Sequence, residues 1–183
     1  AREHLWPGQF ALMSALAKGI SSVDKEAKFS THITWAHQSE FALAFTKSLI
    51  ASAFPLDCMG LSLYPTSEAS PDESFYHAKQ TIRSIVQECG VKVFIAEYAY
   101  PAQEPSGVYK EWNKPVTGYP LTPSGQAAST EDFLTWGMEN GLSGIRPWAP
   151  DLVLHGWEAF SLFEKQGIKL IPRPVLNVLR GIE

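Results

Sequence analysis

The 183-residue sequence predicts an α/β protein with a parallel β-sheet. Short apolar runs alternate with longer amphipathic stretches along the chain, which is the pattern of strands joined by crossover helices. The run at 91–96 is almost continuously apolar, as a parallel strand covered on both faces requires. Hydrophobic residues make up 45% of the chain, so it can bury enough apolar surface to offset the entropy lost on folding.

The first four elements are predicted as helix, strand, helix and strand. Apolar residues recur every three to four positions in the first of them: Phe10, Met13, Leu16 and Ile20. This spacing predicts a helix over 7–20 with one buried stripe. A strand at 28–35, a helix at 39–53 and a strand at 57–64 follow.

The same alternation continues to the end of the chain. A helix begins at Pro71 and stops at Gly90, and the apolar strand follows directly. A loop of roughly twenty residues, rich in Pro, Gly, Tyr and Trp, comes next, and loops of that length are usually functional or mobile. The remaining predicted elements are a helix that begins at Thr122 and Pro123, a strand at 142–147 and a closing helix at 174–182.

Four parallel strands permit two architectures: a small open doubly wound sheet, or half of an eight-stranded β/α barrel. Periodicity alone favours the open sheet, because a complete barrel needs roughly 200 residues or more. In both architectures the carboxyl ends of the strands form the binding face, so polar and aromatic side chains at these ends should converge. Those side chains are His32 and Trp35, Ser62 and Tyr64, Glu97 and Tyr98, and Arg146 and Trp148.

Charge and composition exclude several classes of function. Fifteen Lys and Arg against nineteen Asp and Glu give a net charge of −4, so no basic field would attract nucleic acid. No apolar run approaches the roughly 20 residues of a membrane span, so no membrane partner is expected. The 12% aromatic content is high enough to suggest sugar-stacking platforms as well as core.

No metal or cofactor is expected from the sequence. Cys58 and Cys89 match no zinc pattern and are read as free thiols, although one bridge is possible. His37, His77 and His155 do not form metal-ligand spacing with neighbouring carboxylates. A serine nucleophile elbow, a phosphate-binding glycine loop and a dinucleotide fingerprint are all absent.

Glu97 is the strongest candidate for a catalytic residue. It follows a buried strand, where a carboxylate is placed for nucleophilic or acid/base work, although a solvated strand end would look the same. A retaining glycosidase needs a second carboxyl group about 5 to 5.5 Å away. Neither Asp151 nor Glu3 directly follows a strand, so the sequence offers one catalytic carboxylate where this chemistry needs two.

The other candidates each have a structural alternative. His32 could orient a carboxylate or bind a hydroxyl group, or it could be a core histidine. Tyr64 could donate to the carboxylate or cap the core, and Trp148 could stack on a sugar or pack inside. Tyr109 and Trp112 lie in the long loop and are harder to explain as core.

Five motifs occur in the order in which one enzyme family carries them. They are LWPG at 5–8, DCMGLSLYP at 57–65, IAEYAYP at 95–101, YPLTP with GQ at 119–126, and PWAP at 147–150. In this order they resemble the segment after strand four, the strand-six motif, the strand-seven nucleophile motif, the entry to helix seven and the strand-eight Trp motif of glycoside hydrolase family 53. The members of this family are arabinogalactan endo-β-1,4-galactanases, which are (β/α)8 TIM barrels of a large retaining-glycosidase clan. The resemblance covers most of the chain.

The resemblance implies that residues 1–183 are the carboxyl-terminal half of a single (β/α)8 catalytic domain, with about strands five to eight. Glu97 falls on the nucleophile, and the acid/base Glu of an Asn-Glu pair would lie just before Ala1. The substrate-binding residues implied are His32, Tyr64, Tyr98 and Trp148. On this interpretation the isolated chain is inactive.

The resemblance further implies a secreted, periplasmic or cell-surface enzyme that cleaves β-1,4-galactan and is monomeric at full length. Two departures leave the substrate open: Tyr98 stands where the family usually has Thr, and Ala149 where it usually has Glu. The alternatives are another plant-wall glycan or a noncatalytic carbohydrate-binding protein. Glu104 and Glu111 are too few to suggest the structural calcium of some bacterial relatives.

Overall fold

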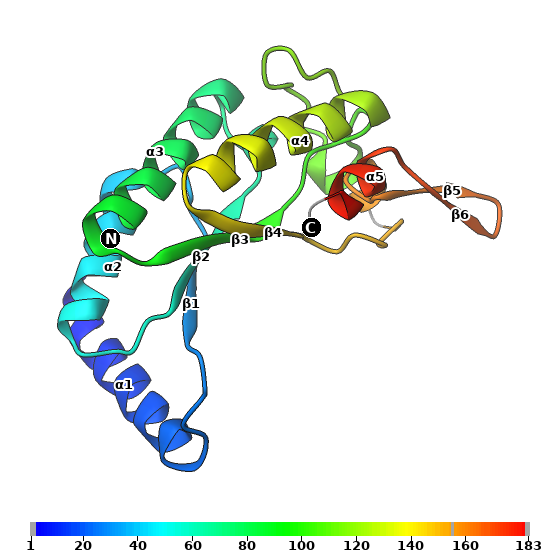
Figure 1. The fold of residues 1–183 in the computed structure, drawn as a ribbon. Coiled ribbons are helices and arrows are strands. Elements are labelled where there is room, and N and C mark those ends of the chain that lie inside the picture. The colour runs from blue at the N-terminus through cyan, green and yellow to red at the C-terminus, as the bar shows by residue number, and fades with distance from the viewer. Residues whose placement is uncertain (1–2, 155, 182–183) are drawn as a thin grey trace.

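The computed structural model describes residues 3–154 and 156–181, which form a curved parallel sheet with helices on its outer side (Figure 1). The sheet has four strands that lie side by side in chain order. They are β1 (Ser30–Ile33), β2 (Cys58–Leu63), β3 (Lys92–Tyr98) and β4 (Leu142–Pro147).

Helices connect these strands and cover the convex face of the sheet (Figure 1). The helices are α1 (Trp6–Val23), which precedes β1, then α2 (Ser39–Ala51), α3 (Pro71–Cys89), α4 (Pro123–Glu139) and the short α5 (Val175–Arg180). An open doubly wound sheet would change direction and carry helices on both faces. Here the strand order never reverses and the concave face stays free of helices, so the arrangement is that of a β/α barrel with four of its strands present.

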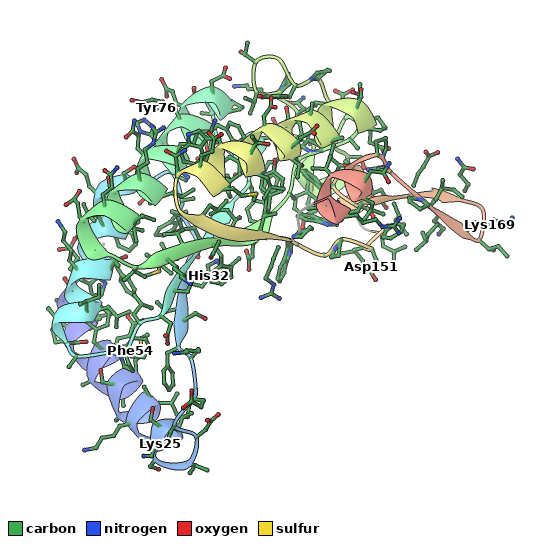
Figure 2. All side chains as sticks on the ribbon, in the orientation of Figure 1. Lys25, His32, Phe54, Tyr76, Asp151 and Lys169 are labelled. Carbon is green, nitrogen blue, oxygen red and sulfur yellow. The ribbon has the colours of Figure 1, made fainter. Side chains whose placement is uncertain are left out.

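The main core lies between the sheet and the helices, where side chains fill the space between the two layers (Figure 2). Leu61 and Leu63 of β2 and Ile95 of β3 are almost fully buried. They pack within one cluster with Ile82 of α3 and Phe133 of α4. In β3 the residues that face the helices are buried, whereas Phe94 and Ala96 on the concave face are only half-buried, so the cover expected on both faces is complete on one of them in the described residues.

The predicted order of elements is confirmed, and two of the expected signals act as predicted. Gly90 ends α3 with φ +65°, a left-handed conformation that favours glycine. The Thr122 hydroxyl caps α4 by accepting a hydrogen bond from the Gly125 N–H at 3.1 Å. The predicted closing helix is shorter than expected, and its last predicted residue, 182, lies outside the described residues.

Two details differ from the predictions. In α1, Phe10 and Ala17 are buried but Leu16 and Ile20 are 66% and 41% exposed, because the buried face runs through positions 10 and 17, and Leu16 and Ile20 lie to one side of it. The sequence reading also missed a hairpin, formed by β5 (Phe163–Gln166) and β6 (Lys169–Pro172), which stands away from the other elements with Lys169 near its tip (Figure 2). No helix in the described part of the chain is both long and apolar enough to cross a membrane.

Candidate active site

The site begins with an irregularity between β2 and β3 that sets the direction of Glu97. The two strands are in register at Leu61 and Ile95, but the next pair is Ser62 with Glu97, so Ala96 is an extra residue on β3. Such a β-bulge changes which face of the sheet the following side chains point to. It brings Glu97 beside Ser62, on the face of the sheet opposite the helices.

Gly60 is the residue that lets the strands approach at the bulge. A Cβ at this position would lie 3.1 Å from both the Cβ of Ala96 and the ring of Phe94. A larger residue would therefore require the side chains of Phe94 and Ala96 to shift by a few tenths of an ångström, next to the pair formed by Ser62 and Glu97.

Two hydroxyl groups donate hydrogen bonds to the same carboxylate oxygen of Glu97. The Ser62 hydroxyl donates to Oε2 at 2.8 Å, and the Tyr64 hydroxyl donates to Oε2 at 2.9 Å. Within residues 3–154 and 156–181, no hydrogen bond reaches Oε1. The carboxylate is therefore held through one oxygen while the other is free to react.

His32 extends this network by one residue. Its Nε2 lies 2.6 Å from the Ser62 hydroxyl oxygen. An ionised Glu97 can only accept, and a serine hydroxyl has one proton to donate, so Ser62 must accept from His32. This assigns the Nε2 proton to His32 and orders three residues from β1, β2 and β3 into one chain of hydrogen bonds.

Tyr64 is suited to remain a neutral donor. Its partial burial raises the pKa of the phenol well above its usual range, and the hydrogen bond to Glu97 and the charge of that carboxylate raise it further. The hydroxyl therefore keeps its proton throughout the pH range in which proteins ordinarily function.

Trp148 lies at the same edge of the sheet, directly after β4. Its side chain is 49% exposed, and its backbone N–H donates to the Tyr98 carbonyl at 2.9 Å. This bond ties the start of the loop after β4 to the end of β3. Ala149, which follows, has φ +43°, a left-handed conformation that is uncommon for a residue other than glycine.

Tyr98 is not part of this group, and the prediction that it contacts a sugar is wrong. Successive strand residues point to opposite faces, so after the bulge Glu97 and Tyr98 cannot share one. Tyr98 is buried and stacks on Phe133 of α4, with ring centroids 6.1 Å apart. Burial raises the pKa of its hydroxyl to about 12.

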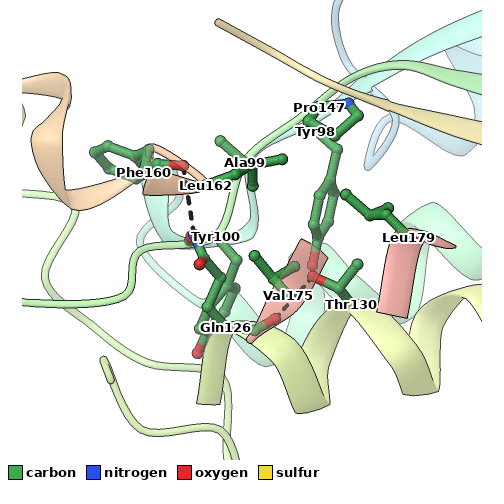
Figure 3. Close-up of a pocket in the computed structure, with 10 residues that line it drawn as sticks. All are labelled: Tyr98, Ala99, Tyr100, Gln126, Thr130, Pro147, Phe160, Leu162, Val175 and Leu179. Carbon is green, nitrogen blue, oxygen red and sulfur yellow. Dashed lines mark hydrogen bonds between the residues drawn. The ribbon is translucent and has the colours of Figure 1, made fainter. Parts of the chain in front are cut away.

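Figure 3 shows Tyr98 extending towards Thr130 of α4, beside Val175 of α5. The cavity that these residues line holds about 10 Å³, close to the minimum for one water molecule and far too small for a sugar. It belongs to the packing between sheet and helices rather than to a binding site.

Ser62 is the functional residue that the predicted site omitted, although it was placed among the strand-end side chains. The available signal was the period of two along β2, because Ser62 shares a face with Tyr64 two positions later. Its partner could not be identified without the register between β2 and β3.

The described residues contain no group of three or more His, Cys, Asp and Glu side chains that could hold a metal ion. His37 lies 3.8 Å from Glu68, and His155 lies outside the described residues. Cys58 and Cys89 are both free thiols.

Comparison with known proteins gives one family and a consistent fold. Residues 2–171 match the sequence model described as Glycosyl hydrolase family 53. The curated proteins gave no significant match.

Among solved structures, the GH53 catalytic domain of Ignisphaera aggregans superposes with a TM-score of 0.73 at 21% identity, over 93% of this chain and 51% of that one. A structure from a study of two fungal β-1,4-galactanases gives a TM-score of 0.77 at 16% identity, over 97% and 55%. The xylanase Xyn10A of Cellvibrio japonicus gives 0.66 at 14%, over 93% and 53%. The chain thus spans about half the length of the structures it resembles, and these likenesses establish the fold.

Proposed function

Because this chain belongs to glycosyl hydrolase family 53, we propose that it carries the nucleophile of a retaining endo-β-1,4-galactanase. Residues 1–183 would be the carboxyl-terminal half of a single (β/α)8 catalytic domain, with β1 to β4 as its strands five to eight. The family match over residues 2–171 and the strand order support this interpretation.

The hydrogen bonding of Glu97 is the observation that carries the proposal. Ser62 and Tyr64 both donate to Oε2, which fixes the plane of the carboxylate and leaves Oε1 for attack. In a retaining mechanism Oε1 forms a bond to the anomeric carbon while the glycosidic oxygen leaves with a proton from a second carboxylic acid. Water then releases the sugar from Glu97, and the second carboxylate takes up the proton of that water.

The second carboxyl group is proposed to be a Glu just upstream of Ala1. Neither Glu3 nor Asp151, the carboxylates considered from the sequence, has a hydrogen bond to the Glu97 network among the described residues. The isolated chain should therefore be inactive on polysaccharide, since the leaving oxygen would have no proton donor.

His32 and Trp148 are proposed to contact the substrate. Both side chains are exposed, His32 beside Ser62 and Trp148 after β4, at the carboxyl ends of the first and last strands of the sheet. An exposed indole offers an apolar face on which a sugar ring can stack. The proposed ligand is a polysaccharide, with no role for nucleic acid or a membrane, and the full-length enzyme is proposed to be a secreted, periplasmic or cell-surface monomer.

The main alternative is a related enzyme that cleaves another plant-wall glycan. The likeness to the xylanase Xyn10A favours it, because the same half-barrel occurs in an enzyme named for a different polysaccharide. Hydrolysis of galactan, xylan, mannan and arabinan by the complete enzyme would separate the two readings. Binding of a glycan without hydrolysis would instead indicate a carbohydrate-binding protein.

The decisive variant of the complete enzyme is Glu97→Ala. We expect it to lose turnover of galactan by several orders of magnitude, and added azide to restore cleavage of an activated aryl β-galactoside with an α-galactosyl azide, of inverted configuration, as product. Azide fits the space left by the carboxylate and replaces it as a nucleophile. Glu111→Ala, at an exposed position in the loop after β3, is the matched control and should keep full activity.

Loss of activity in Glu97→Ala without formation of the azide would contradict the nucleophile assignment. Retained activity would contradict the proposed function as a whole.

A further inference from the structure

The ring of Tyr64 lies against a group of aromatic side chains from two different loops. Tyr109 and Trp112 come from the loop after β3, and Trp157 and Phe160 come from the loop after β4. We call these four residues the aromatic cluster. The Tyr64 ring lies 5.8 Å from the Trp112 ring and 6.3 Å from the Trp157 ring, centroid to centroid.

The aromatic cluster is internally well supported. Trp157 and Phe160 are buried and stacked at 4.7 Å. Tyr109 lies 5.1 Å from both Trp112 and Trp157, so it joins the two loops. The Trp157 indole N–H donates to the Ala149 carbonyl at 3.1 Å, which also fixes the loop next to Trp148.

The backbones of the two loops also meet closely. Gly156 has φ +85°, and a Cβ at this position would lie 2.6 Å from the Ser106 carbonyl oxygen. The approach therefore needs glycine both for its conformation and for the space it leaves. Contacts of this kind make the two loops a single support for the Tyr64 ring.

Tyr64 needs such a support more than Ser62 does. Ser62 is inside β2, where ladder pairing with β3 fixes its backbone, and its hydroxyl is one bond from Cβ. Tyr64 comes after the last residue of β2, and its hydroxyl is carried at the far end of a ring. A small swing of the whole side chain about the Cα–Cβ bond would move the hydroxyl out of the 2.9 Å contact with Glu97.

We propose that Trp112, supported by Trp157, is a positioning residue that holds the Tyr64 ring so that its hydroxyl donates to Glu97. Its consequence for catalysis rests on the proposed function, because it acts on the proposed nucleophile through Tyr64. The loop after β3 thereby controls the geometry of a carboxylate that it follows in sequence.

The test is a double-mutant cycle in the complete enzyme between Trp112→Ala and Tyr64→Phe. Tyr64→Phe removes one hydrogen bond to a charged group, and we expect kcat to fall about 10- to 150-fold. Trp112→Ala should lower kcat by a comparable factor, with a smaller change in KM. The double variant should be no slower than Tyr64→Phe alone, because the hydroxyl that Trp112 positions is already gone.

Two further variants separate positioning from general packing. Trp112→Phe keeps a ring against Tyr64 and should keep most of the activity. Trp136→Ala removes a tryptophan of α4 that packs on Phe133, so any cost it has should add in full to that of Tyr64→Phe. Thermal unfolding of each variant shows that it is folded. Full additivity between Trp112 and Tyr64, or a rise in KM with kcat unchanged, would overturn the proposal.

A readout that does not depend on turnover keeps the proposal distinct from the proposed function. 3-Fluorotyrosine placed at position 64 reports the surroundings of this one phenol through its ¹⁹F chemical shift at neutral pH. Glu97→Gln removes the charge from the group to which the Tyr64 hydroxyl donates, so it should move this signal while Trp112 is present. In the Trp112→Ala background the same change should move the signal much less, and an equal response in both backgrounds would overturn the positioning role. If the unmodified enzyme proves inactive on every glycan, the proposed function fails while this measurement still decides the contact.

Discussion

Replacing Ser62 with alanine tests how the proposed nucleophile is held. The side chain is 2% exposed, so its hydroxyl does not reach solvent or a sugar directly. It accepts from His32 and donates to Glu97, at 2.6 and 2.8 Å. The substitution therefore removes one of the two donors to Oε2 and disconnects His32 from the carboxylate.

The size of the effect follows from the charge on the acceptor. A hydrogen bond to a charged group contributes about 1.5 to 3 kcal/mol. At about 1.4 kcal/mol for each factor of ten, this corresponds to a loss of about 10- to 150-fold in rate if the bond is needed to reach the transition state. The Tyr64 donor remains, so the effect should stay well short of that of Glu97→Ala.

The assay is steady-state hydrolysis of galactan by the complete enzyme. We expect Ser62→Ala to lower kcat with little change in KM, because the buried hydroxyl contacts Glu97 and not the sugar. Ser143→Ala is the matched control, since this serine of β4 donates to the Val93 carbonyl and lies 3.7 Å from the Cys58 thiol, at the amino ends of the strands and away from Glu97. Its kcat should match that of the unmodified enzyme.

A His32 variant extends the same reasoning. If His32 acts on Glu97 only through Ser62, His32→Ala should lower kcat in the parent enzyme but not in the Ser62→Ala background. Any effect of His32 on KM that persists in that background would reflect contact with the sugar. A kcat within twofold of the parent for Ser62→Ala would refute the view that this network orients the nucleophile.

Two further predictions concern stability and assembly. Burial raises the pKa of Tyr98 from 10 to about 12, so the folded state favours the neutral phenol. This contribution, up to ~3 kcal/mol, is present below pH 10 and lost between pH 10 and 12, so Tyr98→Phe should flatten the fall in unfolding free energy measured by urea titration over that range. A fall as steep as in the parent would contradict this assignment. The isolated chain leaves the outer edges of β1 and β4 unpaired, so analytical ultracentrifugation should show self-association, and a monomer at every concentration would count against it.

The order and type of the main elements could be predicted because the apolar residues of each buried face recur with the spacing of a helix or of a strand. The apolar residues before Glu97 and the glycine at position 90, which ends α3, are local sequence signals. They can be recognised without knowing the tertiary contacts. The hairpin was missed because most residues of Phe163–Gln166 and Lys169–Pro172 are exposed, and a strand without a buried face has no hydrophobic period. The one local signal there was Gly167 at the turn, with φ +63°.

The candidate site was predicted in part, and its errors have one cause. Placing Glu97, Tyr64 and His32 at neighbouring strand ends required only their positions along the chain. Which of Glu97 and Tyr98 points to the concave face is determined by the bulge at Ala96. The bulge arises from the pairing of β3 with β2, so the sequence of β3 alone does not reveal it. The aromatic cluster likewise joins residues from two loops, and no local rule connects them.

Covalent trapping is the most direct test of the central claim that Glu97 is the nucleophile of a retaining enzyme. A 2-deoxy-2-fluoro-β-galactoside with a good leaving group should inactivate the complete enzyme, because the fluorine slows release of the glycosyl-enzyme more than it prevents its formation. Mass spectrometry of a proteolytic digest should then find one fluorosugar on the β3 peptide that contains Glu97. A label on any other carboxylate, or hydrolysis that proceeds with inversion and without a label, would contradict the account.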